Sequence, residues 1–119
     1  MFRNRLGFAA VAFVSALTAL SAPANAQGLD TLQGKFAFNW RSNPDREKCV
    51  KIDEKLLTAF KSAKYKCDLK EISNTSSGEK ARVCTAAKDG KETKDGKEYL
   101  IFETFRSCEK ERKDQASNE

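Results

Sequence analysis

Residues 65–73 (YKCDLKEIS) alternate apolar and polar side chains, and residues 80–87 (KARVCTAA) follow after a short segment, 74–78 (NTSSG), of residues that favour turns. Alternation with a period of two is typical of a β-strand with one buried face. A third and more apolar segment, residues 99–108 (YLIFETFRSC), completes the series. These segments predict an antiparallel meander, because consecutive strands joined by short links usually pair as neighbours.

A helix and a short strand are expected before the meander. Within residues 44–63 (PDREKCVKIDEKLLTAFKSA), six apolar side chains fall within one helical arc of about 100°: Cys49, Ile52, Leu56, Ala59, Phe60 and Ala63. Asn43, followed by Pro44, is a typical N-cap for such a helix. Residues 35–40 (KFAFNW) alternate as a strand. The predicted fold is therefore α+β: one amphipathic helix packed on a three- to four-stranded, mostly antiparallel meander that disulfides stabilise.

Four cysteines, at positions 49, 67, 84 and 108, limit the chemistry available to the chain. An even number of cysteines in a short exported chain is typical of a disulfide framework. Thiolate zinc sites usually hold close cysteine pairs, about two to four residues apart, and these cysteines are all farther apart than that. The absence of histidine also excludes Ser-His and Cys-His catalysis. We therefore predict two structural disulfides, no metal site and no cofactor.

The predicted topology ranks the ways in which the cysteines can pair. Cys49 near the start of the helix and Cys108 at the close of the third strand lie at one end of the domain. Cys67 and Cys84 lie toward the opposite end. Because a disulfide requires Cα atoms within about 7 Å of each other, this arrangement favours the pairs Cys49–Cys108 and Cys67–Cys84.

Two features leave the strand registers open. A register that pairs the apolar residues Leu69 and Val83 would place Cys67 and Cys84 on opposite faces, unless a bulge or a one-residue shift intervenes. In addition, residues 88–92 and 94–98 both read KDGKE, and each copy contains an Asp-Gly pair that favours a tight turn. Either copy can supply the turn of a hairpin.

The N-terminal region predicts export. Arg3 and Arg5 precede residues 6–20 (LGFAAVAFVSALTAL), which carry no charge, and residues 24–26 (ANA) form a small-residue cleavage site. This order is typical of a secretory signal peptide cleaved between Ala26 and Gln27. The alternative, a membrane anchor, needs about 20 apolar residues, which is more than this run provides. We expect an extracytoplasmic protein, periplasmic if the source has an outer membrane and secreted otherwise, without a stable membrane span after cleavage.

Cleavage of residues 1–26 would leave a small, highly charged chain of 93 residues with a formal charge of +3. We expect this chain to comprise a flexible segment, 27–34, a single α+β domain, 35–108, and a charged tail, 109–119. Only 19 large apolar residues remain in it. Such a core is marginal for a domain of this size, so crosslinks would add needed stability.

The sequence favours a binding module over an enzyme, because it contains no nucleophile elbow, phosphate loop or metal motif. We expect a partner that is a protein or a cell-envelope component, with inhibition of an extracytoplasmic hydrolase as one example, and no nucleic acid. Trp40 and Tyr99 are candidate anchors, since aromatic residues dominate many interfaces. The alternative is an anion- or lipid-binding module, because lysine-rich patches attract phosphate groups and anionic lipids. The candidate lysines are Lys48, Lys51, Lys55, Lys64 and Lys66.

Intact mass of the exported protein tests the predicted cleavage. We expect the chain to begin at Gln27, because the small residues at positions 24 and 26 fit the cleavage site of signal peptidase. Recovery of the full chain from a membrane fraction would show instead that the apolar run is an anchor.

Overall fold

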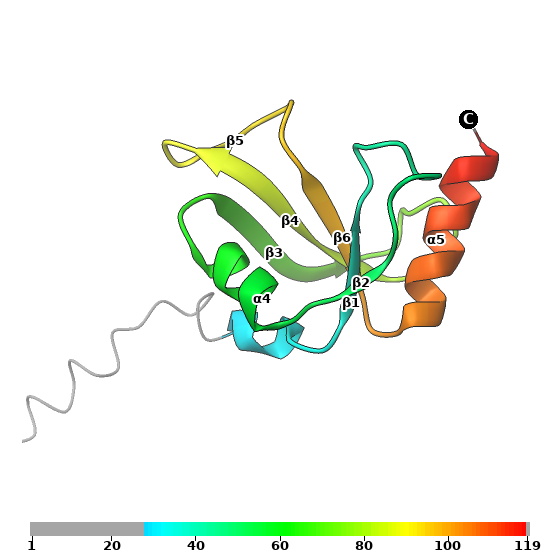
Figure 1. Ribbon diagram of the computed structural model, residues 1–119, viewed down its shortest axis with the longest axis horizontal. Coiled ribbons are helices and arrows are strands. Elements are labelled where there is room, and N and C mark those ends of the chain that lie inside the picture. Colours follow the sequence, from blue (N-terminus) through cyan, green and yellow to red (C-terminus); the bar gives the residue numbers. More distant parts are fainter. Residues whose placement is uncertain (1–27, 119) are drawn as a thin grey trace, which may run out of the picture.

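Six antiparallel strands form one sheet, with helices on both of its faces, in the computed structural model, which describes residues 28–118 (Figure 1). The strands are β1 (Phe36–Asn39), β2 (Val50–Lys51), β3 (Tyr65–Ile72), β4 (Ala81–Lys88), β5 (Lys91–Glu92) and β6 (Glu98–Phe102). The helices are the 3-10 helix η3 (Asp30–Leu32), α4 (Glu54–Lys61) and α5 (Phe105–Ser117). The α+β class is confirmed, whereas the sheet has more strands than the predicted three to four. The cleavage site at Ala26 and Gln27 lies outside the described residues.

Strands β3, β4 and β6 form the predicted meander, with β4 in the middle. Cys67 lies directly opposite Cys84, and the register then shifts between Asp68 and Ile72. Directly opposed residues point to the same face, so both cysteines share one, and Val83 pairs with Asp68 rather than with Leu69. Strand β1 pairs with the other edge of β6, and β2 pairs with β1, so the sheet runs in the order β2-β1-β6-β4-β3.

The helix predicted over 44–63 is much shorter in the structure, which places α4 at Glu54–Lys61. Asn43 does accept a hydrogen bond from the backbone N–H of Asp45, but the helical hydrogen bonds there end after one turn. Val50 and Lys51 pair with β1 instead, and an extended Asp53 then caps α4 by accepting a hydrogen bond from Leu56 N–H at 2.8 Å. Strand pairing along 50–51 therefore overrides a continuous helical pattern.

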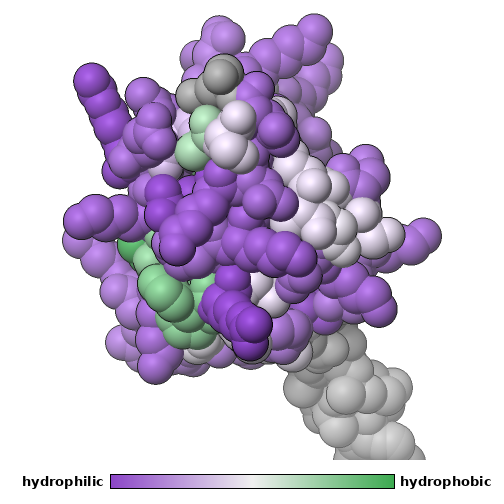
Figure 2. Space-filling view, turned by 90° about the vertical axis from the view of Figure 1, so that its right-hand side faces the viewer, coloured by the Kyte–Doolittle hydropathy of each residue, from purple (hydrophilic) through white to green (hydrophobic). Residues whose placement is uncertain are grey.

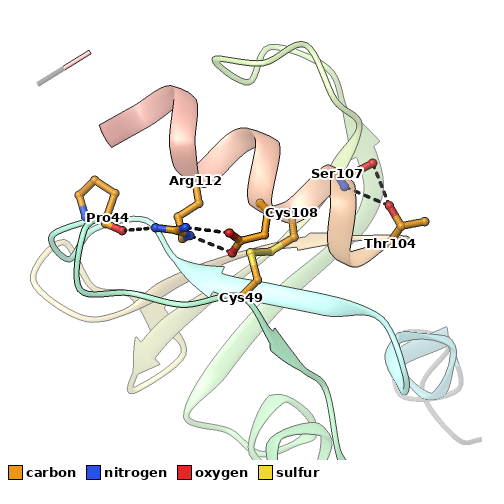
Figure 3. Close-up of a disulfide and its surroundings, with 7 residues drawn as sticks. Pro44, Cys49, Thr104, Ser107, Cys108 and Arg112 are labelled. Atoms are coloured by element: carbon orange, nitrogen blue, oxygen red, sulfur yellow. Dashed lines mark hydrogen bonds and ion pairs between the residues drawn. A yellow bond between two sulfur atoms is a disulfide. The ribbon is translucent and has the colours of Figure 1, made fainter. Parts of the chain in front are cut away.

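The third predicted strand, 99–108, ends at Phe102, and helix α5 begins at Phe105. The hydroxyl of Thr104 accepts a hydrogen bond from the backbone N–H of Ser107 at 3.0 Å, which is a typical N-cap (Figure 3). The segment expected as a charged tail, 109–119, therefore continues α5 as far as Ser117. The domain extends past its predicted boundary at residue 108.

The segment expected to be flexible, 27–34, instead contributes to the core in its described part, residues 28–34. It contains η3, and the side chains of Leu29 and Leu32 are buried. The backbone N–H of Gly34 donates a hydrogen bond to the carbonyl of Ile52 at 2.9 Å, which fastens the segment beside β2. The domain therefore begins before its predicted boundary at residue 35.

Each face of the sheet carries its own small core. Neighbouring residues of β1 and of β6 point to opposite faces, and both neighbours are buried in each strand. The first core lies under η3 and α4 and contains Leu29, Leu32, Ala37, Ile52, Leu57, Phe60, Cys84 and Ile101. The second lies under α5 and contains Phe38, Cys49, Ala81, Leu100, Phe102 and Cys108.

Each core contains one disulfide, and the two disulfides have the predicted connectivity. Cys67–Cys84 crosslinks β3 to β4 beside the first core. Cys49–Cys108 joins the residue before β2 to the first turn of α5 in the second core (Figure 3). In the second pair, however, neither cysteine lies on the element predicted for it. Cys49 precedes a strand, and Cys108 lies in a helix.

The repeated KDGKE motif supplies one hairpin turn, from its first copy. Asp89 and Gly90 both have positive φ, at 54° and 79°, and they connect β4 to β5. A two-residue turn with two positive φ angles matches the twist of a hairpin. The second copy continues into β6, and the guanidinium of Arg41 donates hydrogen bonds to the carbonyls of Thr93 and Gly96.

Removing the two disulfides separately should destabilise the protein to different extents. The Cys49–Cys108 bond spans 59 residues and the Cys67–Cys84 bond spans 17. Loop-closure entropy gives about 4 kcal/mol for the longer loop and about 3 kcal/mol for the shorter one. We expect Cys49→Ala/Cys108→Ala to lower the melting temperature by about ten degrees or more, and by more than Cys67→Ala/Cys84→Ala does. Thermal unfolding followed by circular dichroism checks this order, and the reverse order would contradict it.

Candidate functional site

A groove lined by apolar side chains, two tyrosines and three lysines lies beside α4, and we call it the tyrosine–lysine groove. It is formed by β2, α4, β3 and the start of β6, with a volume of about 370 Å³. Its lining residues are Val50, Lys51, Asp53, Lys55, Leu56, Ala59, Tyr65, Lys97 and Tyr99. Val50 is 44% exposed, although it lies in a strand. The groove therefore presents apolar surface next to several positive charges.

Two tyrosines give this groove its polar character. The rings of Tyr65 and Tyr99 lie 6.2 Å apart, and both pack edge-on against the buried ring of Phe60. Burial raises the pKa of both tyrosines. The neighbouring Tyr99 raises the pKa of Tyr65 further, while Lys97 opposes this shift. Both hydroxyls consequently remain neutral hydrogen-bond donors at physiological pH, and neither donates to a protein group within residues 28–118.

The groove brings together two of the five predicted lysines. Lys51 and Lys55 line it, and Lys97 joins them from the strand side. None of these three ammonium groups forms an ion pair within the described part of the chain. The one acidic lining residue, Asp53, uses a carboxylate oxygen to cap α4. The net charge of the lining residues is therefore positive.

The other candidate lysines lie elsewhere. Lys48, Lys64 and Lys66 do not line the groove. The ammonium of Lys66 donates a hydrogen bond to the carbonyl of Gly90, at the tip of the hairpin that joins β4 and β5. The five lysines therefore do not form one continuous binding face.

Trp40 borders a second concavity, on the α5 face of the sheet, which we call the Trp40 cavity. Its volume is also about 370 Å³. It is lined by Trp40, Ile72, Asn74, Thr75, Ser76, Val83, Glu98, Leu100, Glu111 and Gln115. The indole N–H of Trp40 donates a hydrogen bond to the Glu98 carboxylate at 2.7 Å. This bond fixes the ring at the edge of the cavity.

A buried carboxylate joins α5 to the loop between β3 and β4. Glu111 is 1% exposed and accepts hydrogen bonds from the backbone N–H groups of Ser76 and Ser77, at 3.1 and 2.7 Å, and from the side chain of Gln115. Burial alone would raise the pKa of Glu111, but these hydrogen bonds outweigh burial and lower it. The carboxylate is therefore ionised at neutral pH, and its charge stabilises the loop contact.

Two residues that line the groove, Tyr65 and Lys97, are not among the site residues predicted from the sequence. Tyr65 was assigned to a strand but not to a site, and Lys97 was not singled out. Lys97 and Tyr99 are two residues apart along the chain, so they lie on the same side of an extended segment. Tyr65 could be added only once the pairing of β3, β4 and β6 was known.

Comparison with known proteins gives no guidance on function. The chain matches no protein-family model, no curated protein and no solved structure. Among residues 28–118, no helix is both long and apolar enough to cross a membrane. The same residues contain no group of three or more histidine, cysteine, aspartate or glutamate side chains arranged to hold a metal ion.

Acid should weaken the fold through Glu111. Folding lowers the pKa of Glu111, so the ionised carboxylate adds to the free energy of unfolding above its ordinary pKa of 4.5. This stabilisation is lost as the pH falls below that value and the carboxylate takes up a proton. We expect Glu111→Gln to be less stable than the parent protein at pH 7 and to lose less additional stability between pH 5 and about pH 2.5. Urea unfolding at a series of pH values measures how steeply the free energy of unfolding of each protein falls with pH. Equal slopes for the two proteins would mean that other carboxylates cause the acid sensitivity.

Proposed function

We propose that this protein is an exported, non-enzymatic binding module that holds an anionic component of the cell envelope in the tyrosine–lysine groove. The observation that carries the proposal is the meeting of two tyrosines and three lysines on one groove, where none of the three lysines forms an ion pair with another of residues 28–118. Hydrogen-bond donors and positive charges are the groups that recognise phosphate or carboxylate.

The apolar lining narrows the class of ligand. Leu56, Ala59 and the exposed Val50 line the same groove as the charged groups. A small inorganic anion would leave this surface in contact with water, whereas an amphiphilic anion would cover it. Burial of apolar surface contributes roughly 25 cal/mol per Å². The groove therefore fits a phosphate or carboxylate group that carries an apolar chain.

The disulfides support the exported part of the proposal. Bonds of this kind form and persist in oxidising compartments outside the cytoplasm. Both disulfides lie in or beside a core, and all four cysteines of the chain are paired. An extracytoplasmic location would give the protein direct access to envelope lipids and other surface anions.

Binding of decyl phosphate, with decanol as an uncharged probe of equal chain length, tests this function. We expect Lys51→Gln/Lys55→Gln/Lys97→Gln to weaken decyl phosphate binding by about tenfold or more, because three uncompensated charges leave the groove. Tyr65→Phe/Tyr99→Phe keeps both rings and should weaken binding less. Titration calorimetry below the micelle concentration measures each affinity.

A matched control separates the groove from net charge. Lys48→Gln/Lys64→Gln/Lys66→Gln removes the same three charges outside the groove and should leave the affinity nearly unchanged. Binding to the parent protein should also weaken as the salt concentration rises. Equal losses in the two triple variants, or equal affinities for decyl phosphate and decanol, would overturn the proposed site.

A further inference from the structure

Helix α5 covers only part of its face of the sheet. It packs against β1 and β6, which leaves the same face of β3 and β4 partly open. Ile72 and Val83 lie there and are only half-buried. The Trp40 cavity occupies this opening, between α5, the sheet and the loop that follows β3. It is independent of the tyrosine–lysine groove, since the two share no lining residue.

The walls of the Trp40 cavity combine apolar and aromatic surface. Ile72, Val83 and Leu100 supply aliphatic side chains from three strands. Trp40 is 40% exposed, and its hydrogen bond to Glu98 holds the ring in one position. A fixed, half-exposed tryptophan is a frequent anchor of protein interfaces and attracts cations to its face.

All the ionisable groups that line the cavity are acidic. They are Glu98 and Glu111, and no lysine or arginine lines it within residues 28–118. Arg41 lies 3.5 Å from one Glu98 oxygen and partly compensates that charge. Glu111 has only neutral hydrogen-bond donors and forms no ion pair among the described residues. Since a protein interior screens charge less than water does, this carboxylate gives the cavity a negative potential.

We propose that the Trp40 cavity binds a lysine or arginine side chain of a partner protein. The aliphatic stem of the side chain would contact Ile72, Val83 and Leu100, and its charged end would lie near Glu98 and Glu111. The indole of Trp40 would cover the bound side chain at the edge of the cavity. Aliphatic stems with charged ends match this combination of walls.

Three amino-acid amides test the proposal on the parent protein. The probes are the N-acetyl methylamides of arginine, lysine and norleucine, of which norleucine has a similar stem without charge. We expect the basic amides to bind in the millimolar range, on the order expected for single side chains, and norleucine to bind about tenfold more weakly or worse. Chemical shifts of the indole N–H report binding directly, because Trp40 is the only tryptophan.

Either of two results on the parent protein would overturn the proposal. One is equal binding of the norleucine amide, which would mean that the cavity does not select a cation. The other is the absence of any shift at Trp40 up to about 50 mM of the basic amides, far above the expected affinity. Both results are obtained with the parent protein, so neither requires a variant to fold. Neither result tests ligand binding in the tyrosine–lysine groove.

A charge-matched pair of variants assigns the selectivity to Glu111. Glu111→Gln keeps an oxygen that can accept hydrogen bonds from the loop, and it should weaken arginine binding about tenfold. Glu54→Gln removes the same charge from α4, on the opposite face of the sheet, and should leave arginine binding unchanged. Equal affinities for arginine in these two variants would overturn the role of Glu111.

Discussion

The Cys49–Cys108 disulfide attaches helix α5 to the sheet, and α5 covers the second of the two cores. Only two residues of α5 are buried, Cys108 and Glu111. One is crosslinked and the other is hydrogen-bonded to a loop, so α5 lacks the apolar stripe that attaches most surface helices. Figure 2 shows this side of the molecule as mostly hydrophilic, with its largest apolar patch at the lower left of the view.

Arg112 reinforces the attachment next to the disulfide. Its guanidinium donates a hydrogen bond to the carbonyl of Pro44 at 2.9 Å and contacts the Glu109 carboxylate with two nitrogens (Figure 3). Cys108 and Arg112 thus fasten α5 to the loop that precedes β2, one through a covalent bond and the other through a hydrogen bond. At the opposite end of the loop, Trp40 is held by Glu98.

The same disulfide positions both proposed sites. Cys49 immediately precedes Val50 and Lys51, which line the tyrosine–lysine groove. Cys108 fixes the helix that carries Glu111 and Gln115 to the Trp40 cavity. A disulfide holds these segments in place without requiring many buried apolar side chains, and this chain has few large apolar residues. Two separate sites on opposite faces would let the protein hold an envelope anion and a partner protein together.

The sequence predicted the meander and both disulfides but not the ends of the elements. Residues 65–72 and 81–88 alternate clearly, and their short link leaves little choice of partner. Residues 44–53 have a helical pattern, but pairing of Val50 and Lys51 with β1 is a long-range interaction that local periodicity does not report. Thr104 is a residue type that favours helix N-caps, but the apolar residues on either side of it favoured a continuous strand. Tyr65 and Lys97 belong to one site only through the three-dimensional arrangement of the strands.

Hydrogen exchange of the α5 backbone amides in Cys49→Ala/Cys108→Ala, below its melting temperature, tests the dependence of α5 on the disulfide most directly. The account predicts that protection in α5 falls by about tenfold or more relative to the parent protein, while the amides of β3, β4 and β6 stay protected. Protection of α5 at the level of the parent protein would contradict it, because the helix would then be held by other contacts.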